Sequence, residues 1–195
     1  RLTRLRIPVV NVSLRECADT LPGVLTDSDG IGAMAAEHAL ARGFRHFAFC
    51  GFRGHRYSAE RGLAYAERLR REGFDADMFE GLAPQAPPRE WRRRMAELRD
   101  WVAALPVPSA VFCGNDARAW HVAQVCRELG VRVPEEIAII GADNDDLLCE
   151  MCDPPLSSVD IAAETVGAEA AALLDRLMRG EPPPLSPLLV PPLRV

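Results

Sequence analysis

The chain has 195 residues, of which 48% are hydrophobic and 26% are charged, and its formal net charge is -5. That length suffices for one large domain or two small lobes with a real hydrophobic core. The acidic balance makes this chain by itself a poor DNA-binding protein, because it repels the phosphate backbone. No secretory leader opens the sequence and no apolar run reaches about 18 residues, so we expect no membrane insertion and a cytoplasmic location.

The cysteine pattern favours a reducing environment. Among the six cysteines, Cys50 and Cys113 end apolar runs and are typical of small buried hydrophobic residues. Cys149 and Cys152 have the C-x-x-C spacing, but a zinc site needs a second ligand pair, and a redox motif opens a helix after a strand. Neither context is present, so we expect no metal and no cofactor.

Short apolar runs alternate with amphipathic stretches along the chain. Glycines close several of the amphipathic stretches, as is usual at the end of a helix. This alternation predicts an α/β fold with a doubly wound parallel sheet. In chain order, strands are expected at 7–12, 24–26, 46–50, 77–79, 109–113, 137–141, 156–159 and 188–190, and helices at 29–43, 58–73, 89–105, 116–129 and 162–178.

Polar residues follow one predicted strand after another. In open α/β sheets, ligands bind outside the carboxyl ends of the strands, so side chains that follow the strands are expected to converge on one rim. Arg61 lies in the first turn of the helix that follows one of these loops. The candidate ligand-binding residues are Asn11, Arg61, Asn115, Asp116, Asp143 and Asn144.

The chemistry of this set suits a neutral ligand with many hydroxyl groups, such as a sugar. Carboxylates and amides exchange hydrogen bonds with hydroxyls, and a guanidinium donates a fixed fork of bonds. A phosphate site would instead present glycines and bare backbone amides. Arg61 also has a simpler interpretation, in which it pairs with Glu60 or Glu67 on a helix surface.

Other candidates have simpler interpretations too. Asp116 could be the N-cap of its helix, and residues 144–146 could form a solvated turn. Asn11 could be a satisfied amide at a strand end. Asp143 has no evident helix to cap directly after it, which favours a ligand role.

No catalytic motif is evident. Gly51-x-x-Gly54 lacks the third glycine of a dinucleotide fingerprint, since Tyr57 stands there. The sequence offers no recognisable set of base, nucleophile and metal ligands, so we expect a binding protein and not an enzyme. A metal-dependent hydrolase would require a metal between Asp116 and Asp143.

Motifs along nearly the whole chain match a known family in order and spacing. They lie at Ile7–Val12, Asp27–Gly30, Ala41–Phe49, Ser58–Tyr65, Ala110–Asp116, Val133–Asp143, Pro154–Val159 and Gly167–Ala170. Together they resemble the effector-binding domain of LacI/GalR-family transcription regulators. Gly141–Asp145, Asp116–Ala119 and the tail Leu189–Val195 most resemble members that carry an AraC-type helix-turn-helix domain after this tail.

The resemblance implies a periplasmic-binding-protein type I-like fold, present as one complete lobe plus part of the other. It assigns residues 1–26 and 160–186 to a partial N-terminal lobe. Residues 27–159 and 187–195 would form the C-terminal lobe and a tail leading to a DNA-binding domain outside this chain.

In functional terms, the resemblance implies the sensor of a bacterial regulator. Arg61, Asp116 and Asp143 match positions that hold ligand hydroxyls, and Asn11 matches a polar ligand position on the N-terminal lobe. The expected effector is a small sugar, a pentose such as D-xylose, and the expected assembly is a homodimer. The alternative is a sugar-binding protein of a transporter with the same fold, although six cysteines without an evident pairing argue against export.

Overall fold

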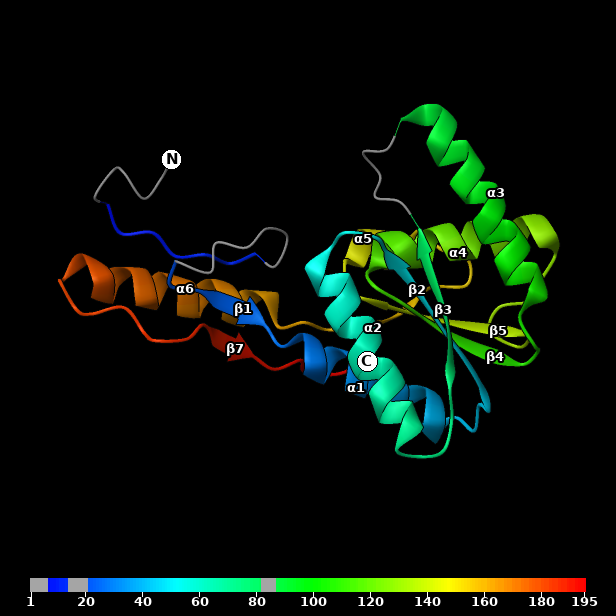
Figure 1. Ribbon diagram of the computed structural model, residues 1–195, viewed down its shortest axis with the longest axis horizontal. Coiled ribbons are helices and arrows are strands. Elements are labelled where there is room, and N and C mark those ends of the chain that lie inside the picture. The colour runs from blue at the N-terminus through cyan, green and yellow to red at the C-terminus, as the bar shows by residue number, and fades with distance from the viewer. Residues whose placement is uncertain (1–6, 14–20, 82–86) are drawn as a thin grey trace.

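A five-stranded parallel sheet forms the larger part of the molecule (Figure 1). The computed structural model describes residues 7–13, 21–81 and 87–195. The sheet order is β3-β2-β4-β5-β6 and all neighbouring strands are parallel. The strands are β2 (His46–Phe52), β3 (Ala76–Gly81), β4 (Ser109–Cys113), β5 (Ile137–Ala142) and β6 (Ser157–Val159).

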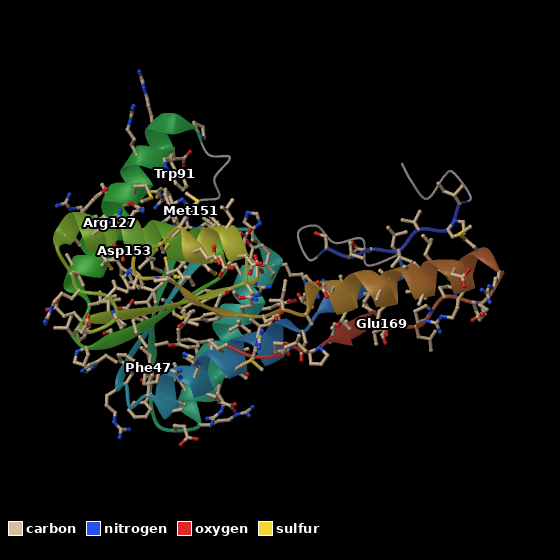
Figure 2. All side chains as sticks on the ribbon, turned by 180° about the vertical axis from the view of Figure 1, so that it is seen from behind. Phe47, Trp91, Arg127, Met151, Asp153 and Glu169 are labelled. Atoms are coloured by element: carbon tan, nitrogen blue, oxygen red, sulfur yellow. The ribbon has the colours of Figure 1, made fainter. Side chains whose placement is uncertain are left out.

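Helices cover both faces of this sheet, which confirms the predicted doubly wound fold. Successive residues of a strand point to opposite faces. Phe47 and Phe49 therefore face one helix pair, and Ala48 and Cys50 face the other. Figure 2 views the molecule from behind and labels Phe47 on the first of these faces. The first pair is α1 (Ser28–Ala41) with α2 (Arg56–Arg70), and the second is α3 (Pro88–Ala104) with α4 (Asp116–Leu129).

A smaller part lies beside the large sheet (Figure 1). It consists of the parallel pair β1 (Val24–Thr26) and β7 (Leu188–Val190), packed on α6 (Ala163–Met178). β7 pairs with β1 in this smaller part, and the chain returns to the large sheet after Val190. There Leu193 donates its amide to the Asp160 carbonyl at 2.9 Å. The division of the chain into two lobes stays a prediction.

One local expectation was wrong, and one helix start differs. Residues 7–12 were expected as a strand, but among the described residues they form only an isolated bridge between Asn11 and Gly23. The helix expected over 29–43 begins at Ser28, and its cap is Asp27, whose carboxylate accepts the Gly30 amide at 3.0 Å.

Two further differences bear on the site. The helix expected over 58–73 begins at Arg56, and Ser58 accepts the Phe52 amide at 2.9 Å and so ties the helix to the end of β2. A short helix, α5 (Asp146–Glu150), follows β5 and is capped by the Asp145 carboxylate. No helix among the described residues is long and apolar enough to cross a membrane.

The first two helices lie in close contact at Gly32. A Cβ atom there would lie 2.3 Å from the Arg61 carbonyl oxygen and 2.8 Å from the Ala64 Cβ atom. Both distances are shorter than a van der Waals contact, and one partner is backbone, which cannot rotate away. Gly32 therefore sets the position of the α2 turn that carries Arg61.

We predict that Gly32→Ala lowers the free energy of unfolding by about 1–3 kcal/mol, because overpacking forces two helices apart. Gly167→Ala is the matched control, since Gly167 lies inside α6 with nothing within 4 Å of its would-be Cβ atom. The control should raise stability by about 0.5–1 kcal/mol through helix propensity. Urea unfolding measures both, and equal effects would contradict the close approach at Gly32.

Candidate functional site

A cavity of about 320 Å³ opens where the strands of the large sheet end. One wall comes from α2 and from the loops that follow β4 and β5. The other comes from residues 12–13, the end of β1 and the segment between β6 and α6. The lining residues are Val12, Ser13, Thr26, Tyr57, Arg61, Asn115, Asp143 and Ile161. The cavity thus lies outside the carboxyl ends of the strands, the usual ligand position in a sheet of this kind.

Arg61 is a buried cation beside this cavity. Its Nη1 atom donates to the Gly114 carbonyl at 2.8 Å and to Asp143 Oδ1 at 3.0 Å. Its guanidinium carbon lies 5.2 Å from the centre of the Tyr57 ring, within range of a cation–π contact. The simpler interpretation, an ion pair with Glu60 or Glu67, is wrong, because Glu60 pairs with Arg56 at 2.6 Å and Arg61 turns inward to Asp143.

Asp143 presents its carboxylate to the cavity from an unusual backbone conformation, with φ at 117°. Its side chain is 39% exposed, against 4% for Arg61. Burial raises the pKa of the Asp143 carboxyl, and the Arg61 guanidinium opposes that rise. Among the described residues no hydrogen bond reaches its Oδ2 atom, so an acceptor remains for a ligand hydroxyl.

Asn115 lies between these residues and the start of α4. Its Oδ1 atom accepts the Arg118 amide at 3.0 Å, and its Nδ2 atom lies 3.5 Å from the Tyr57 hydroxyl. Asn115 is therefore the N-cap of α4, and the cap role considered for Asp116 was wrong. An Asn at the cap can serve the helix with its oxygen and a ligand with its nitrogen.

Asp116 points away from the cavity and is 1% exposed. Its Oδ1 atom accepts the Ser158 hydroxyl at 2.6 Å, and its Oδ2 atom accepts the Asp145 amide at 2.8 Å. Burial raises the pKa of the Asp116 carboxyl, and these two hydrogen bonds oppose the rise. Both carboxylate oxygens are thus engaged in holding the loop after β5.

The remaining two candidates lie at the edge of the site. Asn144 is exposed and lies in the turn that leads into α5. Its backbone N–H donates to the Ser158 hydroxyl at 3.0 Å. Asn11 bonds locally, donating to the Ser13 carbonyl at 3.2 Å and accepting the Ser13 amide at 3.1 Å. It thereby shapes the segment whose next two residues, Val12 and Ser13, line the cavity.

The structure thus brings Arg61, Asn115 and Asp143 together at one cavity. It adds Tyr57, which lies one helical turn before Arg61 and contacts both the Arg61 guanidinium and Asn115. The i, i+4 spacing of these two residues is the sequence signal that would have found Tyr57.

Neither a metal site nor a disulfide is evident among the described residues. They contain no cluster of three or more His, Cys, Asp or Glu side chains that could hold a metal ion. Cys149 and Cys152 are both free thiols.

A second cavity, also of about 320 Å³, lies between the end of α1 and the loops before β5 and β6, but its walls are mostly apolar and include Phe44, Val133 and Leu156.

A series of aromatic side chains in contact with one another extends from Tyr57 to Trp91 in α3. Phe52 lies between His55 and His121, with ring centres 6.0 and 6.4 Å away, and Trp91 (Figure 2) lies 5.0 Å from His121. Burial, with a smaller effect of the nearby Arg118 guanidinium, lowers the pKa of His121 to about 4. His121 is therefore neutral near pH 7 and packs among the rings of Phe52, Trp91 and Trp120.

Comparison with known proteins places this chain in a family. The sequence matches the periplasmic binding protein-like domain family over residues 36–195. The chain therefore belongs to this family, and the expected resemblance to LacI-type effector domains is confirmed.

The relatives are transcription regulators. The chain is 34% identical to the xylose operon regulatory protein of Escherichia coli K12 across 100% of this chain and 51% of that protein. The solved xylose-binding transcription activator xylR is 33% identical with a TM-score of 0.86, covering 99% of this chain and 52% of that one. The complex of the regulator CelR with cellobiose is 26% identical with a TM-score of 0.75, covering 94% and 55%. The chain thus spans about half the length of these relatives.

We predict that lowering the pH reduces the free energy of unfolding of the wild-type protein, because His121 becomes protonated on unfolding. An unfolded histidine binds a proton near pH 6.5, but the folded one does so only near pH 4, so the free energy of unfolding falls as the pH drops between these values. His121→Phe removes that contribution. Between pH 7 and pH 5 the wild type should lose about 2 kcal/mol more than the variant, measured by urea unfolding. Parallel pH dependences in the two proteins would contradict the buried, neutral histidine.

Proposed function

We propose that this chain is the effector-binding domain of a LacI-family transcription regulator and that its effector is a pentose, D-xylose. The observation that carries the proposal is the Arg61–Asp143 pair at the cavity, with Asn115 and Tyr57 beside it. The Arg61 guanidinium is a charged hydrogen-bond donor, and the Asp143 carboxylate beside it is a charged acceptor. Such groups bind neutral hydroxyls strongly without requiring a charged ligand.

The cavity volume and the relatives support a small sugar. About 320 Å³ lies at the lower end of the usual range for ligand pockets, which suits a monosaccharide. The xylose operon regulatory protein and the xylose-binding activator xylR match this chain along its length. No recognisable catalytic set surrounds the cavity among the described residues, and we propose a sensor without enzymatic activity.

The cavity walls suggest how binding is communicated. Arg61, Asn115 and Asp143 belong to the part built on the large sheet, whereas Thr26 and Ile161 belong to segments that lead to or from the smaller part. A sugar that contacts both walls favours one arrangement of the two parts, and its differential affinity sets the size of the shift. In the proposed cytoplasmic homodimer, this shift changes DNA binding by a domain outside these residues.

Calorimetric titration of the full-length protein with D-xylose tests the effector. We expect saturable binding at or below millimolar sugar and weaker binding of a hexose such as D-glucose. The absence of heat with millimolar D-xylose would contradict the pentose assignment.

We predict that Asp143→Ala weakens D-xylose binding by about 1.5–3 kcal/mol, the usual contribution of hydrogen bonds to a charged group. Asp146→Ala is the matched control, because Asp146 is an exposed carboxylate three residues further along, outside the cavity lining. Titration calorimetry should show unchanged affinity for the control. If Asp143→Ala also binds like the wild type, the Asp143 carboxylate is not a sugar ligand.

A further inference from the structure

A buried hydrogen-bond pair lies beneath the loop that carries Asp143. Asp116, at the start of α4, and Ser158, in β6, are 1% and 6% exposed. The Ser158 hydroxyl donates to Asp116 Oδ1 at 2.6 Å. Neither residue lines the cavity, so the pair is set behind the site.

This pair holds successive backbone amides of the loop. The Asn144 amide donates to the Ser158 hydroxyl at 3.0 Å, and the Asp145 amide donates to Asp116 Oδ2 at 2.8 Å. Just before them, the Asp143 amide donates to the Val159 carbonyl at 3.1 Å. The whole turn is thereby fixed to β6 and α4.

The turn needs such support, because its backbone is strained. Asp143 has φ at 117° and Asn144 has φ at 54°, both in regions that residues with a side chain rarely adopt. Conformations of this kind persist only where the surrounding structure enforces them. The hydrogen bonds to Asp116 and Ser158 hold Asn144 and Asp145, and the Val159 carbonyl and Arg61 hold Asp143 itself.

The packing around the pair admits little freedom. A Cβ atom on Gly141 of β5 would lie 2.1 Å from Asp116 Oδ1, so the carboxylate sits directly against the strand backbone. Asp116 therefore connects α4, β5 and β6 through one side chain. Both of its carboxylate oxygens accept hydrogen bonds from the protein, so the Asp116 side chain is not placed to contact a ligand.

We propose that Asp116 and Ser158 are positioning residues for effector binding: they set the sugar affinity by holding Asp143 in the strained turn that aims its carboxylate at Arg61. This inference rests on the proposed function. It assigns Asp116 an indirect role, in place of the direct ligand contact expected from the family resemblance, and it gives Ser158 a role that no sequence motif indicated.

Ser158→Ala tests the proposal, with Ser157→Ala as the matched control. Ser157 precedes it in β6, is exposed, and donates no side-chain hydrogen bond among the described residues. We expect Ser158→Ala to weaken D-xylose binding about tenfold, a change of ~1.4 kcal/mol. Ser157→Ala should leave the affinity unchanged, and Ser158→Thr, which keeps the hydroxyl, should restore most of it.

Amide hydrogen exchange provides a readout that does not depend on the sugar. In Ser158→Ala the Asn144 amide should exchange about tenfold faster or more, because its acceptor is gone. The Asp145 amide should keep more of its protection, because Asp116 still accepts it. If Ser158→Ala does not fold, Ser158→Cys, which retains a weak donor of similar size, should give an intermediate loss in both measurements.

A Ser158→Ala protein that is less stable to heat but binds D-xylose like the wild type would overturn the proposal, because the pair would then be merely structural. Unchanged Asn144 exchange would overturn it as well. If the wild type itself binds no D-xylose, the proposed function fails, and the exchange experiment still decides whether the pair holds the turn.

Discussion

The buried Arg61 guanidinium joins three segments at the carboxyl edge of the large sheet. The Arg61 side chain is 4% exposed, and a guanidinium in that position must be paired and hydrogen-bonded, because an uncompensated buried charge is strongly destabilising. Its Nη1 atom meets both Gly114 and Asp143, so one side chain of α2 fixes the ends of β4 and β5. The cavity exists where it does because these three segments are joined there.

The surrounding structure supports this connection from two sides. Behind α2, the bare backbone of Gly32 allows α1 to approach closely enough to set the turn that bears Arg61. Behind Asp143, the Asp116–Ser158 pair fixes a backbone turn with positive φ values. Buried hydrogen bonds hold that turn, and the Arg61 guanidinium orients the Asp143 carboxylate in the absence of a ligand. Preorganisation of this kind reduces the cost of binding.

Much of this arrangement follows from the sequence. Apolar runs that alternate with amphipathic stretches require a parallel sheet, and parallel strands place their carboxyl ends at one edge, so the convergence of Arg61, Asn115 and Asp143 was predictable. The direction of each side chain was not. Asn115 and Asp116 are adjacent, yet one caps α4 beside the cavity and the other turns into the protein, because a single step along the backbone reverses the side-chain direction. The role of Ser158 depends on β6 lying next to β5, a contact between segments that no local pattern encodes.

The most direct test of the account is a crystal structure of the full-length protein with D-xylose. We expect sugar density in the cavity beside Asn115, with at least one hydroxyl in hydrogen-bond contact with the Asp143 carboxylate and the Arg61–Asp143 pair intact. Sugar bound elsewhere, such as in the apolar cavity between α1 and the loops before β5 and β6, or bound without contact to Asp143, would contradict it.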